Sequence, residues 1–422
     1  MSSAKIKIRD TTVGYLFWDD PNQTALFEAD QEYINSNFNI APLLHENKNE
    51  VLSGKDYARQ FQGMIPIFND SLPDSFGNKV FKEWLEQTNI DQSEMNPVER
   101  LLYVGSRGIG ALEYFEGKSV PNIAHNIDLN ELARVSNKII QRKYEQEDFL
   151  DNPEALRNIL TIGSSVGGAQ AKILIAQTED NRLFAGDVLH DKKVDYYIVK
   201  LAHDPKNTWA CEKNYVEYVY NLIAQEIGIN VSESKLIKEG GRAHFASKRF
   251  DRNGNKKIHK QTVNAMTGFY GKSMEFGYVD IFKIIAFLDL PYVNLEQLFI
   301  QMAFNVASSN RDDHTKNFSF LMNDTGEWSL SPAYDLTFPR DPYETFISSH
   351  QIHINGKTKG ILRADLVEVA KLVGVRNYNQ IIDRVIEGAS SFSNKIKNYP
   401  VSSTTSRLIS EEIAENIKRL MK

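Results

Sequence analysis

The stretch SSNRDDHTKNFSFLM, residues 308–322, decides how the whole chain is interpreted. Several charged and amide side chains crowd into it before the sequence turns into an apolar run. Asp312 and Asn317 stand five residues apart. In the catalytic loop of protein kinases, an aspartate and an asparagine at this spacing position the substrate hydroxyl and bind magnesium. A single such pair also arises by chance, and a solvated loop before a strand is the alternative.

The sequence after this cluster favours the kinase interpretation. FSFLM indicates a strand, NDTGE a turn, and WSLSPAYDLTF a returning strand that ends on Asp335. Such a hairpin would bring Asp335 beside Asn317. Magnesium prefers oxygen ligands of this kind, completed by substrate phosphates. The Asp-Phe-Gly signature of protein kinases is absent, so a typical protein kinase is a poor match.

A candidate phosphate-binding loop lies upstream, in TIGSSVGGAQAKILIA, residues 161–176. Gly167 and Gly168 allow the backbone to approach a ligand closely, and the amides of such a turn can bind an anion. An ordinary turn between two elements is the alternative. The Gly-Lys-Ser/Thr ending of a Walker A motif is missing.

The segment VDYYIVKLA, residues 194–202, is rich in strand-forming residues and places Lys200 on one face with Tyr196 and Ile198. Kinases hold nucleotide phosphates with a strand lysine paired to a helix glutamate. A lysine whose head group reaches solvent at a sheet edge is the alternative. The following helix offers Glu212 and Glu217, and the helical face count favours Glu212.

Length and composition set broad bounds. The 422 residues predict two or three lobes. A net charge of −6 excludes the basic excess of a nucleic-acid binder, so contact with DNA would require a partner. The one cysteine, Cys211, excludes an internal disulfide. The start of the sequence has no signal-peptide pattern, and no apolar run is long enough for a bilayer. We therefore expect a cytoplasmic protein without a membrane attachment.

The distribution of patterns predicts an α+β fold with a mixed α/β N-terminal lobe and a mainly helical C-terminal lobe. Strand patterns and the helical pattern SFGNKVFKEWLEQ, residues 75–87, occupy the beginning. Helical patterns follow from about residue 129 to 144 and from 152 to 160. Strand patterns run from 161 to 252, broken by a helix near 215–227. The division predicted from these patterns is 1–125, 126–250 and 251–422.

Five motifs in the same order resemble the HipA family of bacterial serine/threonine kinases, the toxin halves of toxin–antitoxin pairs. They are SSVGGAQAK, YYIVKL, SKRFDR, NRDDHTKNFSFL and LSPAYDL. The beginning of the chain is also similar, through VGYLFW, LPDSFGNKVFKEWL and YVGSRGIGALEYFE. The resemblance covers most of the chain. It implies a two-lobed protein-kinase-like fold of the HipA type, with ATP and Mg²⁺ in the cleft between the lobes.

The resemblance also implies roles for individual residues. Asp312 resembles the catalytic aspartate, and Asn317 and Asp335 resemble the metal ligands. The residues implied in nucleotide binding are the phosphate lysine Lys200, the loop residues Gly167, Gly168, Ala169 and Gln170, the hinge residues Lys248, Arg249 and Phe250, and His314. For His314, a hydrogen bond that orients the loop is an equal alternative.

Two choices stay open at this point. Ser165 matches a serine that family members autophosphorylate, and Ser164 is the adjacent alternative; the added charge would disturb a loop shaped around phosphates. The resemblance favours Glu217 as the partner of Lys200, against the helical face count.

The resemblance implies a toxin kinase that autophosphorylates and acts on a translation component such as an aminoacyl-tRNA synthetase. It also implies a HipB-like helix-turn-helix antitoxin as partner, with DNA contacted only through that antitoxin. Two other functions are compatible with the sequence. One is a catalytically silent pseudokinase that serves as co-repressor, and the other is a small-molecule kinase. The presence of Lys200, Asp312, Asn317 and Asp335 together argues against a silent protein.

Overall fold

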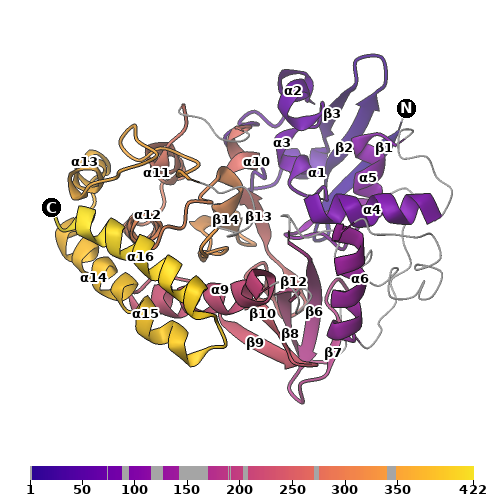
Figure 1. Cartoon of the computed structure of the whole chain (residues 1–422). Coiled ribbons are helices and arrows are strands. Elements are labelled where there is room, and N and C mark those ends of the chain that lie inside the picture. Colours follow the sequence, from indigo (N-terminus) through magenta and orange to yellow (C-terminus); the bar gives the residue numbers. More distant parts are fainter. Residues whose placement is uncertain are drawn as a thin grey trace. The chain divides into compact units, whose positions relative to one another are not determined.

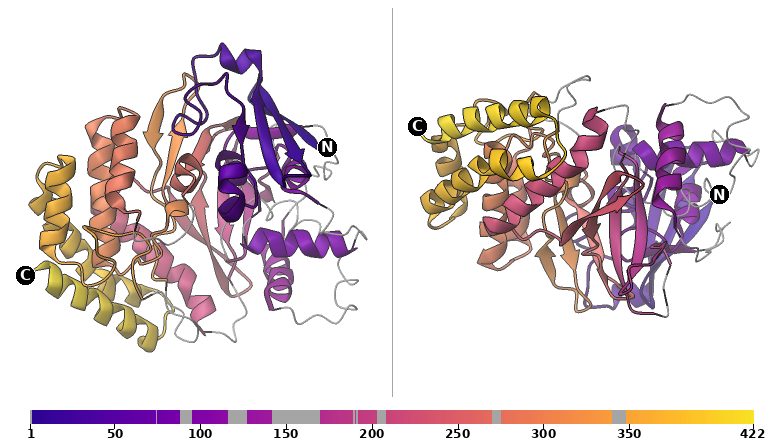
Figure 2. Two further views of the ribbon diagram at one scale, coloured as in Figure 1. Left: turned by 90° about the horizontal axis from the view of Figure 1, so that it is seen from above. Right: turned by 60° about the horizontal axis from the view of Figure 1, so that its bottom comes forward.

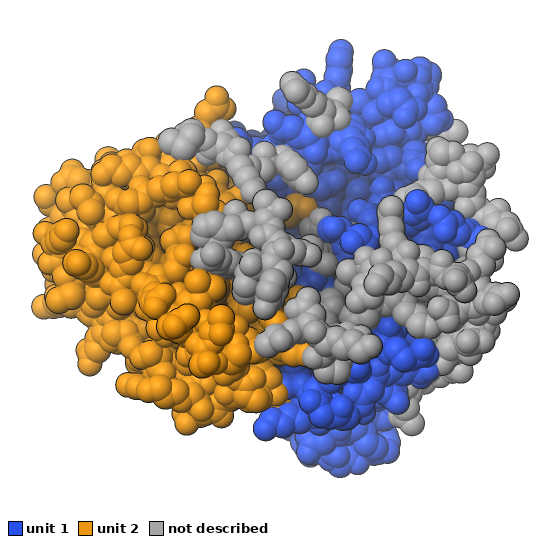
Figure 3. Space-filling view, viewed as in Figure 1, with its two compact units in different colours: residues 1–204, 237–270, 321–327 blue, residues 205–236, 271–320, 328–422 orange. Residues whose placement is uncertain are grey.

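The computed structural model describes residues 2–73, 75–87, 95–115, 127–141, 170–188, 190, 192–202, 208–269, 275–339 and 348–422. The chain divides into two compact units (Figure 3). Unit 1 comprises residues 1–204, 237–270 and 321–327, and unit 2 comprises 205–236, 271–320 and 328–422. Each unit is thus assembled from separate stretches of sequence. The predicted boundaries near residues 125 and 250 stay a prediction.

The first sheet of unit 1 is antiparallel and has the strand order β4-β3-β2-β1-β5. Buried and half-buried residues alternate along β1, as expected for a strand with one face on the core. The strands are β1 (Ser3–Ile8), β2 (Thr11–Asp19), β3 (Thr24–Ala29), β4 (Leu52–Ser53) and β5 (Leu112–Phe115). The short helices α1 (Gln31–Ile34), α2 (Ala58–Phe61) and α3 (Pro66–Asn69) and the 3₁₀ turn Lys55–Tyr57 follow between them.

Helix α5 (Pro97–Val104) precedes β5 and has a well-defined start. The Asn96 side chain accepts a hydrogen bond from the Glu99 N–H at 3.0 Å, and the Glu99 carboxylate accepts one from the Asn96 N–H at 3.0 Å. Pro97 occupies the first helical position, where its missing N–H has no intrahelical partner to lose.

The second sheet of unit 1 has the order β7-β6-β8-β10-β9. The interior strand β6 is buried at nearly every position, which indicates that both of its faces are covered. Helices α4 and α6 pack against one face through a shared apolar cluster (Figures 1 and 2). The elements are α4 (Ser75–Gln87), α6 (Leu129–Gln141), β6 (Lys172–Thr178), β7 (Leu183–Ala185), β8 (Val194–Lys200), β9 (Ser234–Glu239) and β10 (Arg242–Lys248).

A tight hairpin follows β10, formed by β11 (Arg252–Asn253) and β12 (Lys256–Lys257). The turn predicted at residues 251–255 is shorter in the structure, because Arg252 and Asn253 form β11 and the hairpin turn lies at Gly254 and Asn255, where Gly254 has the positive φ of 54° that favours glycine. Strand β13 (His259–Thr262) and helix α10 (Val263–Thr267) continue the chain.

Unit 2 is mainly helical and is built around α12 (Tyr292–Ala307). Every residue from Leu298 to Ala307 is buried, as expected for a helix with neighbours all round. It packs against α11, α14 and α16 (Figure 1). The other helices are α9 (Thr208–Glu226), α11 (Tyr278–Phe287), α13 (Arg363–Val373), α14 (Tyr378–Ser390), α15 (Phe392–Lys395) and α16 (Ser403–Leu420), with 3₁₀ turns at Thr315–Asn317 and Ile396–Asn398. Helix α9 begins earlier than the predicted residue 215.

The predicted strand at FSFLM is confirmed as β14 (Ser319–Met322), and the chain returns as β15 (Trp328–Leu330). The prediction that the returning strand reaches Asp335 is wrong. Pro332 has no N–H to donate to a ladder, and the next residue, Ala333, donates its N–H to Asn230 O instead, at 2.8 Å. Asp335 itself has a φ of +53° and lies in irregular backbone.

The helices in the described part of the chain are all too short or too polar to cross a bilayer.

Candidate functional site

The candidate catalytic loop starts with a sharp turn at the end of α12. Ser309 has a φ of +58°, in the left-handed region that non-glycine residues rarely adopt. Two hydrogen bonds fix the turn on either side of it. The Asn310 N–H donates to Asn305 O at 2.9 Å, and the Tyr220 hydroxyl of α9 donates to Ser308 O at 2.6 Å. The turn directs the following residues away from the helix axis.

Asp312 and Asn317 are physically linked in this loop. The Asn317 Nδ2 donates to the Asp312 carbonyl oxygen at 2.7 Å, and the Asn317 N–H donates to His314 O at 2.8 Å. The hydrogen bond from the Asn317 side chain to the Asp312 carbonyl thus closes a ring that spans residues 312–317. The amide Oδ1 is the atom that Asn317 can offer to a cation, because the amide nitrogen is only a hydrogen-bond donor. The Asp312 side chain is 38% exposed, and His314 Nε2 lies 3.9 Å from its Oδ1, beyond hydrogen-bond distance.

The segment that carries Asp335 is tied to the same loop. The Tyr334 hydroxyl donates to Lys316 O at 2.6 Å and shares a hydrogen bond with Ser319 Oγ at 2.6 Å. The chain neighbours of Asp335 and Asn317 are thus held together. An amide oxygen and a carboxylate suit Mg²⁺. Within the described ranges, no three His, Cys, Asp or Glu side chains come together as a metal site.

Asp313 anchors the loop from inside, a role that the sequence analysis missed. Its side chain is fully buried. The carboxylate accepts hydrogen bonds from the Tyr278 hydroxyl at 2.9 Å, the His350 Nδ1–H at 2.7 Å and the Gln351 N–H at 2.8 Å. Burial and the nearby Asp313 carboxylate raise the pKa of Tyr278 well above its usual value, so its hydroxyl stays a donor. Neither spacing nor composition shows which of two consecutive aspartates faces the interior.

Lys200 ends β8 in unit 1, and Lys172 stands directly opposite it on β6. Both residues are 7% exposed. Opposite residues of an antiparallel pair project from the same face, so the two ammonium groups share one side of the sheet. Positively charged side chains that project from one face of a sheet can contact an anionic ligand together. Lys172 was missed in the sequence, because only the strand register places it beside Lys200.

The proposed hinge residues follow β10 and differ in their surroundings. Lys248 forms an ion pair with Asp195 at 2.8 Å. Arg249 is buried, and its guanidinium binds both carboxylate oxygens of Asp251, at 2.9 and 2.7 Å. Burial alone would raise the pKa of Asp251, but the Arg249 and Arg252 guanidinium groups outweigh it and hold that pKa well below its usual range. A nucleotide contact from this segment would therefore use backbone groups or Phe250, because the Arg249 guanidinium is committed to Asp251.

Glu212 has a structural task within unit 2. Its buried carboxylate accepts hydrogen bonds from the Ser402 N–H at 2.8 Å, from the Ser402 hydroxyl at 3.3 Å and from the Thr405 hydroxyl. These groups form the N-terminus of α16, which attracts negative charge. The helical face count had favoured Glu212 as the partner of Lys200. In the structure, the carboxylate of Glu212 binds the start of α16. Glu217 is also buried, at 3% exposure.

Most of the glycine-bearing loop lies outside the described residues. This applies to Ser164, Ser165, Gly167, Gly168 and Ala169. Gln170 is described, and it lies two positions before β6.

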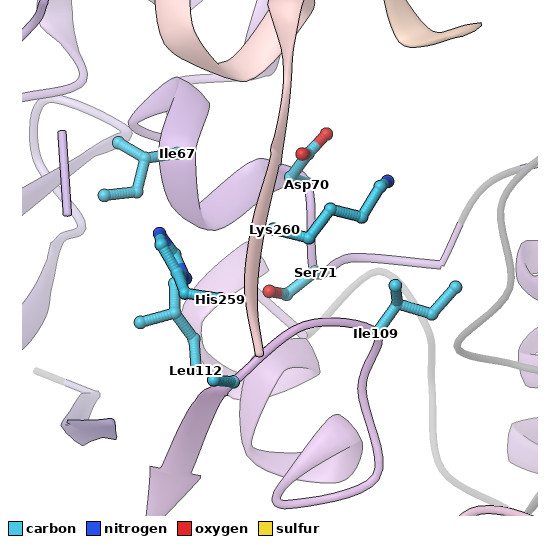
Figure 4. A pocket seen from close by; sticks show the side chains of 8 residues that line it. Ile67, Asp70, Ser71, Ile109, Leu112, His259 and Lys260 are labelled. Carbon is cyan, nitrogen blue, oxygen red and sulfur yellow. The ribbon is translucent and has the colours of Figure 1, made fainter. Parts of the chain in front are cut away.

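A small pocket in unit 1 lies between α3, β5 and β13 (Figure 4). The Asp70 carboxylate at its wall accepts hydrogen bonds from the Thr262 N–H at 2.8 Å and the Thr262 hydroxyl at 2.7 Å. Ser71 Oγ accepts one from the Tyr114 hydroxyl at 2.8 Å. The pocket has room for about one water molecule. Its polar groups join neighbouring segments, and it is too small for a nucleotide.

Comparison with known families identifies both halves of the chain. Residues 4–115 match the HipA N-terminal domain, and residues 164–392 match the HipA-like C-terminal domain, which alone covers more than half of the sequence. The chain belongs to the HipA family. The predicted fold class, a two-lobed α+β fold of the HipA type, is confirmed.

One solved structure supports the assignment of the HipA fold. It is a chain from the complex of the toxin–antitoxin system proteins HipA and HipB with operator DNA from Shewanella oneidensis MR-1. It has 17% sequence identity and a TM-score of 0.71, over 99% of this chain and 97% of that one. The Helicobacter pylori proinflammatory kinase CtkA matches more weakly, with 16% identity and a TM-score of 0.37 over 56% of this chain and 93% of that one.

Proposed function

We propose that this HipA-family protein is an ATP- and Mg²⁺-dependent serine/threonine protein kinase that acts as the toxin of a toxin–antitoxin system. The ring closed by Asp312 and Asn317 is the observation that carries the proposal. It ties the side-chain amide of Asn317 to the backbone of Asp312, and Tyr334 ties the segment of Asp335 to the same loop. This is the set of groups that phosphoryl transfer requires.

Each group then has a task. The Asp312 carboxylate accepts the hydrogen bond of a serine or threonine hydroxyl and aligns its oxygen for attack on the γ-phosphorus. Asn317 and Asp335 would hold Mg²⁺, which neutralises charge on the phosphates. Lys172 and Lys200 supply positive charge for the nucleotide phosphates, together with the loop that contains Gly167 and Gly168.

Replacing Asp312 with asparagine tests the proposal. We expect Asp312→Asn to bind ATP and to transfer phosphate at least about a thousandfold more slowly, because a carboxamide is a poor acceptor for the hydroxyl proton. Radiolabelled ATP and intact-mass analysis measure the transfer, and calorimetry measures ATP binding. The matched control is Asp383→Asn, which removes an exposed carboxylate of α14 that pairs with Arg363.

The outcomes separate the alternatives. Transfer by Asp312→Asn at the wild-type rate would remove Asp312 from the base role. A wild-type protein that binds ATP but adds no phosphate to itself or to proteins would be a pseudokinase or a small-molecule kinase. In an active kinase we expect autophosphorylation at Ser165, with Ser164 as the adjacent candidate, and serine-to-alanine variants distinguish the two by mass.

The proposal extends to partners and location. The family and the composition of the Shewanella complex support a HipB-like helix-turn-helix antitoxin as partner. The net charge of −6 supports DNA contact only through that antitoxin. We propose a cytoplasmic protein whose substrate is a translation component such as an aminoacyl-tRNA synthetase. Phosphoproteomics after controlled expression would identify the substrate.

A further inference from the structure

Helix α16 lies beyond the region that matches the HipA-like C-terminal domain, yet it contacts the start of the catalytic loop. Glu412 forms an ion pair with Arg311 at 2.7 Å, with side chains that are 20% and 16% exposed. Arg311 directly precedes Asp312. One turn further along α16, Asn416 Nδ2 donates to Ser309 Oγ at 2.7 Å and to Val306 O at 2.9 Å.

These contacts converge on the strained residue of the turn. Ser309 is held in the left-handed region, which is unfavourable for a non-glycine residue. Its hydroxyl lies 3.4 Å from Arg311 NH2, 3.5 Å from Glu412 Oε2 and 2.7 Å from Asn416 Nδ2. A residue in such a conformation keeps it only when its surroundings determine it. Here α16 provides part of those surroundings, in addition to the hydrogen bonds of Asn310 and Tyr220 described above.

Helix α16 is itself fixed at its N-terminus, independently of the loop. Glu212 of α9 binds Ser402 and Thr405, as described above. The helix therefore connects α9 to the residues just before Asp312, and its N-terminus has an attachment that does not involve Ser309. A rigid element of this kind can hold a loop in one arrangement.

We propose that Glu412 and Asn416 are positioning residues for the catalytic loop. Through Arg311 and Ser309 they determine where the Asp312 carboxylate lies, and they do not touch substrate or nucleotide themselves. The catalytic assignment in this inference rests on the proposed kinase function. The contacts with α16 do not depend on it.

Three variants test the inference. Glu412→Gln keeps the shape of the side chain and removes its charge, and Asn416→Ala removes both hydrogen bonds. We expect each to slow autophosphorylation by about 10- to 100-fold, because small displacements of a catalytic group are costly, while the Kd for ATP changes less than about twofold. The control is Glu411→Gln, the neighbouring exposed carboxylate that faces Arg407 on the same helix, for which we expect no change.

A second measurement does not require activity. Hydrogen exchange of the backbone amides in residues 308–314 should be faster in Glu412→Gln and Asn416→Ala than in the wild type and in Glu411→Gln. Glu412→Asp keeps the charge on a shorter side chain, and its rate should lie between wild type and Glu412→Gln.

The two proposals fail in different ways. Unchanged exchange and unchanged transfer in Glu412→Gln, whose isosteric change preserves the fold, would overturn the positioning role. A loss of ATP affinity as large as the loss of rate would also overturn it, because it would indicate general disruption. If wild type transfers no phosphate but exchange responds to Glu412→Gln, the kinase proposal fails and the anchoring by α16 stands.

Discussion

The adjacent residues Asp312 and Asp313 have opposite environments. The Asp312 side chain is 38% exposed, whereas the Asp313 side chain is fully buried and accepts three hydrogen bonds. A buried carboxylate with several donors is a strong structural anchor, and the loss of any one donor leaves it partly unsatisfied. The stability of the loop thus depends on the residue beside the proposed base.

Removing the Tyr278 hydroxyl tests this anchor. Tyr278→Phe deletes the donor to Asp313 and also the acceptor of the Asn305 amide, which lies 2.9 Å away. We expect the free energy of unfolding to fall by about 2 kcal/mol or more, because two buried polar groups lose a partner. Urea denaturation followed by circular dichroism measures the change.

Tyr292→Phe is the matched control, since the Tyr292 hydroxyl accepts one hydrogen bond from the Arg376 N–H at the surface. Its unfolding free energy should change by less than about 0.5 kcal/mol. Equal losses in the two variants would mean that the Asp313 network does not depend on Tyr278.

Single residues show what the sequence could and could not reveal. The Asp312–Asn317 spacing was sufficient to find the loop, because it lies within one short stretch. The place of Lys172 beside Lys200 could be found only from the pairing of β6 with β8. The bond between Glu212 and Ser402 could be found only from the position of α16. These contacts join residues that are distant in sequence, which local patterns do not report.

Among the elements, α9 and α14 approach each other closely at Gly388. A Cβ at this position would overlap Cγ2 of Ile227, which is buried. We expect Gly388→Ala to lower the free energy of unfolding by about 1 to 2 kcal/mol, since overpacking outweighs the better helix propensity of alanine. Thermal or urea denaturation provides the measurement.

The same substitution in an Ile227→Ala background gives the control. With the Ile227 side chain shortened, Gly388→Ala should no longer destabilise and should gain up to about 1 kcal/mol from helix propensity. An equal loss in both backgrounds would show that the contact with Ile227 is not the cause.

Sequence periodicity predicted the bounds of elements with a clear apolar face. It was less accurate for the end of a strand that one residue determines. Helix α4 and strand β14 appear as predicted. Strand β15 stops at Leu330, well before the predicted end. Ladder hydrogen bonds decide where a strand ends, and a proline two residues later was the available signal.

At the scale of the whole molecule, buried histidines predict a pH dependence of stability. Burial lowers the pKa of His244 and of His259 to about 4. Unfolded histidine has a pKa near 6.5, so between pH 6.5 and 4 the unfolded chain binds more protons and stability falls as the pH falls. Asp187 has the opposite effect on the free energy of unfolding. Burial raises its pKa to about 6, so it stabilises the folded protein at low pH, and this stabilisation is lost as the pH rises through that value.

The net expectation is a loss of about 1 to 2 kcal/mol between pH 7 and pH 5.5. Urea midpoints across this range measure it. His244→Asn provides the comparison: an amide oxygen can replace Nδ1 as acceptor of the Ala202 N–H, at 3.1 Å in the wild type, but does not titrate. The variant should show a clearly smaller pH dependence, and an unchanged slope would contradict the role of His244.

The order of motifs along the chain was sufficient to predict the family and the mixed and helical lobes. It could not predict the two compact units. Their composition depends on contacts between stretches that are not continuous in sequence. The salt bridge between Arg9 and Asp324, at 2.8 Å, is one such contact within unit 1.

The discontinuous make-up of unit 1 bears on how the protein is made. Strand β8 gains its neighbour β10 only after residue 248 has been synthesised, and the last stretch of the unit ends at residue 327. Most of the chain must therefore leave the ribosome before this unit can be completed. No single truncation point yields it as an intact fragment, so a shortened form for expression would require joining distant segments through a new linker.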